Sequence, residues 1–125
     1  MRMHDLISIV DDDPSVCRAV GTLVRSLGYP VRTFGSAEAF LDSGVARESA
    51  CLISDVRMPG MSGIDLQHRL LVAGIILPLI FIGANPDPGV VNAALSAGAI
   101  AFHAKPFDQE ELVASIERAM SQKAA

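Results

Sequence analysis

Four charged side chains in this sequence have the types and positions that phosphoryl chemistry requires: Asp11, Asp12, Asp55 and Lys105. Each lies at the end of a short apolar run. Three carboxylates that come together repel one another, so the cluster needs a cation, and an all-oxygen ligand set suits Mg²⁺. Asp55 would attack an activated phosphorus centre while the Lys105 ammonium stabilises charge on the transferred oxygens. The expected product is an acyl phosphate, whose added charge would draw nearby loops toward it.

Each of these residues also has a simpler structural interpretation. Acids at strand ends often cap the following helix, which is the interpretation we favour for Asp13 and leave open for Asp11 and Asp12. A lysine at a strand end, such as Lys105, is usually a solvated charge. The chemical hypothesis therefore depends on all four side chains meeting in one place.

The elements that must position these residues are strands and helices in alternation. Apolar runs predict strands at 6–10, 31–34, 50–54, 78–82 and 100–104. Apolar spacing and N-caps at Asp13, Ser36 and Asp108 predict helices at 14–27, 36–41, 62–72, 90–97 and after 108. Because right-handed crossovers place helices on both faces, this order predicts an α/β fold with a parallel sheet. Sites in such sheets form outside the carboxyl ends of the strands, where the four charged residues fall.

Bulk properties indicate one domain without a nucleic-acid surface. A chain of 125 residues, 50% of them hydrophobic, is long enough for one well-filled core, which we place at residues 1–121, with 122–125 as a polar tail or the start of a linker. The formal net charge of -4 argues against direct nucleic-acid binding, which needs clustered Lys and Arg. Cys17 and Cys51 lie in apolar segments and are expected to be buried thiols.

A cytoplasmic location is expected from two further observations. The longest apolar stretch without charge, residues 70–85, is interrupted by Gly74, Pro78 and Gly83, so it is a poor candidate for a membrane span. The first six residues do not have the apolar run or cleavage site of a secretory signal.

Four motifs resemble the receiver domains of bacterial two-component response regulators, in particular those of the nitrogen-fixation regulator group. They are I-V-D-D-D-P at 9–14, I-S-D-V-R-M-P-G-M-S-G at 53–63, A-G-A at 97–99 and K-P-F at 105–107. Their order and spacing extend over nearly the whole chain. The resemblance implies a flavodoxin-like (βα)5 sandwich with the parallel strand order 2-1-3-4-5.

The resemblance also implies roles and partners. Asp55 would be phosphorylated by a sensor histidine kinase, with Lys105 as the catalytic cation. Mg²⁺ would be held by Asp12, Asp55 and the backbone carbonyl of Arg57, with Asp11 acting largely through water. A homodimer through the fourth helix, fifth strand and fifth helix, and a fused DNA-binding output domain outside this chain, are further expectations. Beyond self-catalysed phosphotransfer and dephosphorylation, no enzymatic activity is expected.

One position departs from the resemblance. Relatives end the fourth strand with Thr or Ser, whose hydroxyl bonds the phosphoryl group, whereas this chain has Gly83. The N–H of Ala84 remains, but one hydrogen bond to a charged acceptor, about 1.5–3 kcal/mol, is missing. Phe102 matches the aromatic residue that moves inward in relatives, and it is equally well interpreted as core. The loop 85–89 contains two prolines, so we expect a damped or biased switch.

Two other functions compete with a phosphorylation switch. A degenerate receiver would keep the fold and act through phosphorylation-independent protein contacts, and Gly83 is its main support. A small hydrolase or phosphotransferase with an aspartyl-phosphate intermediate is disfavoured, because Arg57 holds the place where such enzymes carry a general acid.

Overall fold

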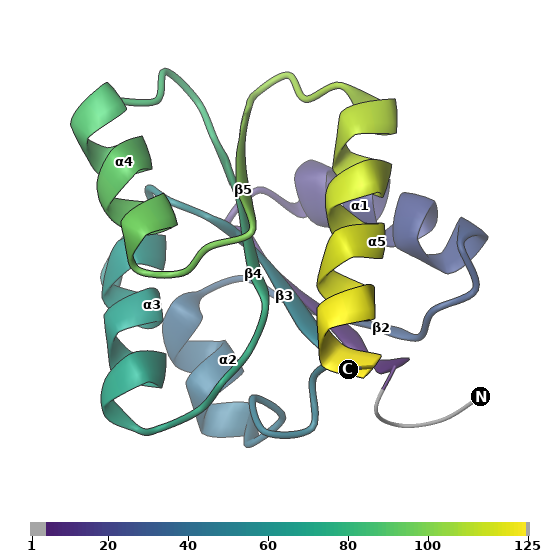
Figure 1. The fold of residues 1–125 in the computed structure, drawn as a ribbon, viewed down its shortest axis with the longest axis horizontal. Coiled ribbons are helices and arrows are strands. Elements are labelled where there is room, and N and C mark those ends of the chain that lie inside the picture. The colour runs from purple at the N-terminus through teal and green to yellow at the C-terminus, as the bar shows by residue number, and fades with distance from the viewer. Residues whose placement is uncertain (1–4, 125) are drawn as a thin grey trace.

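A computed structural model, which describes residues 5–124, contains five parallel strands between two layers of helices (Figure 1). The strands are β1 (Ile7–Val10), β2 (Val31–Phe34), β3 (Cys51–Asp55), β4 (Leu79–Gly83) and β5 (Ala101–Ala104). Their order in the sheet is β2-β1-β3-β4-β5, which confirms the predicted flavodoxin-like topology. Residues 1–4 of the predicted domain and residue 125 of the predicted tail lie outside the described residues.

The strand register aligns the carboxyl ends of the central strands. Val10 in β1 is opposite Ser54 in β3, so the residues that follow them, Asp11 and Asp55, lie side by side at the edge of the sheet. Gly83 at the end of β4 is opposite Ala104 in β5, which places Lys105 at the same edge. The sequence thereby delivers three of its four candidate residues to one rim through strand pairing alone.

The helices are α1 (Pro14–Ser26), α2 (Ala37–Ser43), α3 (Gly63–Val72), α4 (Pro88–Ser96) and α5 (Gln109–Ala124). The predicted N-caps are confirmed. Asp13 accepts a hydrogen bond from Ser15 N, Ser36 from Ala39 N, and Asp108 from Glu111 N. These side chains satisfy amide groups that the first turn of a helix leaves without a partner.

The predicted start of the fourth helix is wrong. We expected the helix to begin at Val90 after a turn, but α4 begins at Pro88, and Asp87 is its N-cap, accepting from Gly89 N at 2.7 Å. Pro88 is suited to the first helical position because its missing N–H would have no partner there. Only residues 84–87 therefore connect β4 to α4, and Pro86 is the one proline in that connection.

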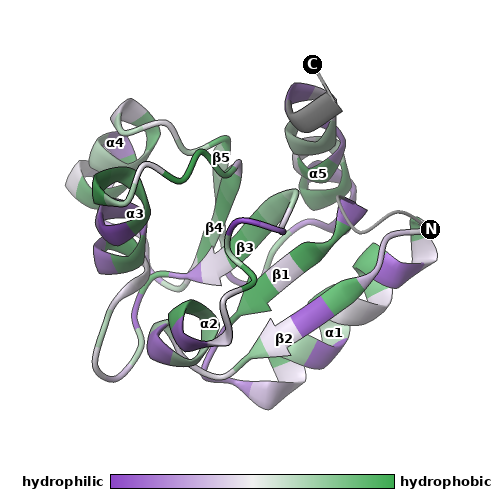
Figure 2. Ribbon diagram, turned by 90° about the horizontal axis from the view of Figure 1, so that it is seen from below, coloured by the Kyte–Doolittle hydropathy of each residue, from purple (hydrophilic) through white to green (hydrophobic). Residues whose placement is uncertain are grey.

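Two apolar cores flank the sheet. Alternate strand residues face α1 and α5 on one side, and the intervening ones face α2, α3 and α4 on the other. Figure 2 shows hydrophobic residues concentrated in the central strands and polar residues on the outer faces of the helices. Cys17 and Cys51 are buried and free, as expected. Among residues 5–124, no helix combines the length and hydropathy needed to cross a bilayer.

Candidate acidic site at the carboxyl edge of the sheet

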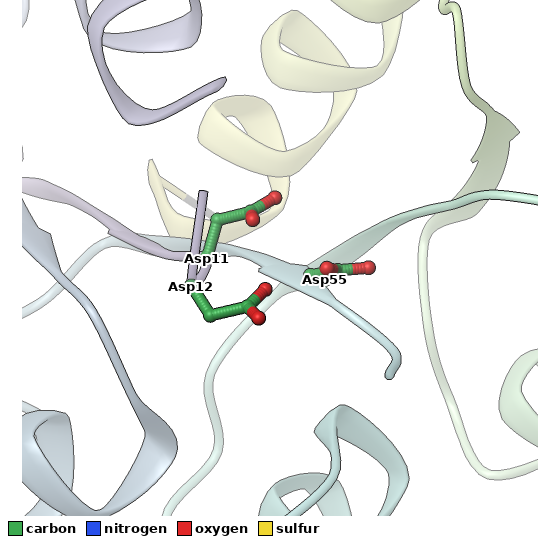
Figure 3. Close-up of side chains that lie close together, drawn as sticks. All are labelled: Asp11, Asp12 and Asp55. Atoms are coloured by element: carbon green, nitrogen blue, oxygen red, sulfur yellow. The ribbon is translucent and has the colours of Figure 1, made fainter. Parts of the chain in front are cut away.

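Three carboxyl groups meet at the carboxyl ends of β1 and β3. Oxygen atoms of Asp11, Asp12 and Asp55 all lie within 4.8 Å of one another. Figure 3 shows the side chains of Asp11 and Asp12 directed toward the side on which Asp55 lies. Asp11 and Asp55 are 3% and 7% exposed, whereas Asp12 is open to solvent. The cluster therefore has a buried inner part and an accessible outer part, as a site for a small charged group requires.

Lys105 completes the predicted constellation from the end of β5. Its Nζ lies 3.0 Å from Asp11 Oδ2 and 3.2 Å from Asp55 Oδ2. Burial by itself favours the neutral amine, but the hydrogen bonds and charges of Asp11 and Asp55 outweigh burial and raise the pKa of Lys105. The structure thus brings together all four side chains that the sequence singled out, with an ammonium group between two acids.

The pKa of Asp11 is raised above its ordinary value, and burial is the main cause. The charge of Asp55 raises this pKa further. Two hydrogen bonds, from Asp13 N at 2.9 Å and from Lys105, oppose this rise but do not cancel it. A divalent cation would relieve the remaining repulsion. Three clustered carboxylates with one open side are a donor set that fits Mg²⁺, which keeps several waters when bound to proteins.

The loop that follows Asp55 is fixed at its near end. Val56 N donates to Asp55 Oδ1 at 2.7 Å, and Gly63 N donates to the carbonyl of Val56 at 2.8 Å. Arg57 has an exposed side chain and Met58 is buried in the core. Arg57, whose carbonyl we expect to bind metal, therefore lies between buried residues, with Asp55 and Val56 before it and Met58 after it.

Sequence reasoning missed the importance of Gly63. A Cβ atom at this position would overlap the carbonyl oxygen of Asp55 and lie 3.0 Å from a ring carbon of Phe81. Gly63 does not have a positive φ, so space rather than conformation requires glycine. The available signal was a glycine directly after the N-cap Ser62, a position where helix capping itself does not require one.

The ring of Phe102 lies directly over Gly83. A Cβ atom at position 83 would be 3.2 Å from Phe102 Cζ and 3.4 Å from Val56 Cγ2. The ring also packs against Phe81, with 5.9 Å between centroids, and belongs to the edge of the core. A cavity of about 30 Å³ remains between Gly83, Phe102 and the 84–87 connection, which is large enough to hold a water molecule. Even a single Cβ atom at position 83 would require the ring to move by a few tenths of an ångström.

Replacing Lys105 by Met is expected to destabilise the metal-free protein by about 2 kcal/mol, since two buried acids would lose their shared partner. Because the side chain of Lys105 is 22% exposed, the expected loss lies below that of a fully buried pair. Added Mg²⁺ should recover more stability in this variant than in the parent chain. Urea unfolding in EDTA and in Mg²⁺ measures both effects, and Arg69→Met, at an exposed cation, is the control. Equal stability of the variant and the parent chain in EDTA would contradict the expectation.

A five-stranded sheet of this order, with clustered acids and a lysine at its carboxyl edge, defines the receiver class of signalling domains. The chain belongs to the response regulator receiver domain family, whose sequence profile matches residues 7–117.

Individual relatives agree with this assignment. The response regulator protein TmoT of Ectopseudomonas mendocina is 46% identical over 117 residues, which cover 94% of this chain and 53% of that protein. The transcriptional regulatory protein FixJ of Azorhizobium caulinodans is 34% identical over 94% of this chain and 56% of its own, confirming the resemblance to the nitrogen-fixation regulator group. A structure of the response regulator StyR superposes with a TM-score of 0.88 at 40% identity, covering 95% of this chain and 60% of StyR. The chain thus spans about half the length of the curated relatives it matches.

Proposed function

We propose that this receiver domain accepts a phosphoryl group on Asp55 from a histidine kinase and so changes its protein contacts. The observation that supports this most directly is the Asp55 carboxylate, 7% exposed and 3.2 Å from the Lys105 ammonium, beside two further acids. A buried carboxylate that only stabilises the fold would need one cation or hydrogen-bond donor as its partner. Here a cation and two other acids share one rim, and this arrangement is unfavourable unless charge is added or moved there.

The chemical step transfers one phosphoryl group. An oxygen of Asp55 bonds to phosphorus while the bond between phosphorus and the donor nitrogen breaks, and the electron pair leaves with the imidazole, which takes up a proton. Lys105 is placed to pair with an oxygen of the transferred group. When bound by Asp12, Asp55 and the Arg57 carbonyl, with Asp11 acting through water, Mg²⁺ supplies positive charge to those oxygens. Water that reaches the solvent-exposed side of the cluster, at Asp12, would later hydrolyse the acyl phosphate. This hydrolysis is the only other reaction that we assign to the domain.

Incubation with acetyl phosphate tests this proposal. We expect the protein to gain the mass of one phosphoryl group in Mg²⁺ and to gain none in EDTA. Peptide mapping should place the group on Asp55. Failure to incorporate phosphate in excess Mg²⁺, with the protein folded by circular dichroism, would reject phosphoryl acceptance.

A second function, a protein-interaction module that does not depend on phosphorylation, is supported by the Gly83–Phe102 contact. The hydroxyl that would hold a phosphoryl group is absent, and Phe102 already occupies the space beside Gly83. Partner binding that is equal with and without phosphate on Asp55 would favour this function. Partner binding that changes with phosphate would favour the switch.

Gly83→Thr is expected to enlarge the phosphorylation-dependent change in the amide chemical shifts of α4, because it restores a hydroxyl that can bond the phosphoryl group. The new side chain must displace Phe102, which we expect to cost about 1–2 kcal/mol of stability. Gly83→Ala is the matched control, since it also presses on the ring but supplies no hydroxyl. If the two variants respond to phosphorylation equally, the missing hydroxyl does not limit the switch.

The wider setting is also proposed. A homodimer through α4, β5 and α5 is a further part of the proposal. A DNA-binding output domain beyond residues 1–121 is consistent with relatives of about twice this length, one of which is named a transcriptional regulatory protein. With a net charge of -4, nucleic-acid binding would belong to that other domain rather than to this one. Residues 122–125 would begin the linker, although α5 itself continues to Ala124. We place the activity in the bacterial cytoplasm.

A further inference from the structure

Glu38, at the start of α2, makes a hydrogen bond to the loop that follows Asp55. Its Oε2 accepts from the backbone N–H of Met61 at 2.9 Å, across 23 residues of sequence. That bond, together with one from the amide of Glu38 itself, lowers the pKa of the carboxyl group, so it is ionised at neutral pH. The side chain is exposed and adds nothing to the core. A contact of this kind holds a loop rather than the fold.

The backbone of the loop is shaped to receive the carboxylate. Gly60 has φ +77°, and a Cβ atom there would lie 2.5 Å from Glu38 Oε2. A side chain at position 60 would therefore exclude Glu38 from Met61. The glycine thus permits both the turn and the hydrogen bond.

The bond to Met61 lies near the end of the 56–62 loop, which also carries the proposed metal ligand Arg57. The start of this loop is fixed by two hydrogen bonds, from Val56 N to Asp55 and from Gly63 N to the carbonyl of Val56. Ser62 and Asp65 form a capping box that fixes the start of α3. The hydrogen bond from Met61 to Glu38 attaches this part of the loop to α2. Met61 lies two residues after Pro59 and three residues after Met58. The segment that carries Arg57 is thereby attached to α2 as well as to the sheet.

We propose that Glu38 is a positioning residue, which holds the 56–62 loop so that the Arg57 carbonyl is preorganised for the cation beside Asp55. This inference rests on the proposed function of the site. Loss of the bond should loosen the loop without unfolding the domain, and outer partners of this kind commonly affect metal affinity.

Three variants test the inference. Glu38→Ala should weaken Mg²⁺ binding roughly three- to tenfold in an NMR titration and accelerate hydrogen exchange of the Met61 amide, with an unchanged urea midpoint. Glu38→Gln, whose amide oxygen can still accept from Met61, should restore most of the Mg²⁺ affinity and the protection. Asp42→Ala removes an exposed carboxylate from the last turn of the same helix and should alter neither readout.

The outcomes separate this inference from the proposed function. Unchanged Mg²⁺ affinity in Glu38→Ala, or Glu38→Gln as weak as Glu38→Ala, would overturn the positioning role. If the parent chain binds Mg²⁺ but is never phosphorylated, the proposed function fails while the positioning role is still decided by the titration and by the exchange of Met61. If the parent chain binds no Mg²⁺, both fail.

Discussion

Asp55→Asn should lower the rate of phosphoryl incorporation from acetyl phosphate by at least about a thousandfold, because loss of a nucleophile removes nearly the whole catalytic effect of a site. The amide has the shape of the carboxylate but lacks its charge and its nucleophilic oxygen. Its single amide oxygen can still accept from Val56 N, which donates to Asp55 Oδ1 at 2.7 Å. The amide nitrogen replaces Oδ2 and loses the pair with Lys105 at 3.2 Å, but Lys105 keeps its partner Asp11 at 3.0 Å. The fold should therefore survive, and the loss would belong to the chemistry.

The measurement is intact mass after a fixed incubation in Mg²⁺. Asp42→Asn is a suitable control, since it neutralises an exposed acid of α2 and should be phosphorylated at the parental rate. Phosphate incorporated on Asp12 at the parental rate in the Asp55→Asn protein would contradict the assignment, because it would show that the accessible acid of the cluster, rather than the buried one, is the nucleophile.

The features that could be predicted from sequence are those fixed by local or strand-level rules. The N-caps Asp13, Ser36 and Asp108 were identified because a capping side chain bonds an amide two or three residues away. The parallel sheet followed from the alternation of apolar runs and helical patterns. Once the sheet was parallel, its carboxyl edge had to collect Asp11, Asp55 and Lys105, whatever the details of packing.

The features that sequence missed depend on choices between local rules or on distant contacts. Pro88 and Gly89 are compatible either with a loop turn or with the first turn of a helix. The hydrogen bond from Gly89 N to the N-cap Asp87 favours the helix. The requirement for glycine at position 63 arises from the carbonyl of Asp55 and the ring of Phe81, which only the folded chain brings near. The Glu38–Met61 bond joins residues 23 apart, and no periodicity predicts it.

A tension between stability and function underlies the site. Burial of Asp11 and its repulsion from Asp55 disfavour the ionised cluster, and Lys105 offsets this only in part. An apolar rim would be easier to fold. Under the proposed function, this unfavourable charge would make the site responsive, because a bound cation and then a phosphoryl group would each change the electrostatic balance.

Gly63→Ala is expected to destabilise the protein by about 3 kcal/mol or more, at the upper end for overpacking, since the new Cβ would meet backbone rather than a flexible side chain. To make room, either the start of α3 or the carbonyl of Asp55 must shift. The second movement would also displace the carboxyl group of Asp55 from Lys105. Reduced Mg²⁺ affinity should therefore accompany the lower urea midpoint.

Gly21→Ala provides the matched comparison, because Gly21 is a buried glycine inside α1 whose added Cβ would approach only the flexible end of Arg25, at 3.4 Å, and Val31 at 3.8 Å. Alanine favours a helix interior over glycine by roughly 0.5–1 kcal/mol, so this variant should be as stable as the parent chain or more stable. The same methyl group thus has opposite effects at two buried glycines, according to whether backbone or a mobile side chain is its neighbour. If Gly63→Ala unfolds at the parental urea concentration, the carbonyl of Asp55 is not held where the structure places it, and the geometry assigned to the acidic site fails with it.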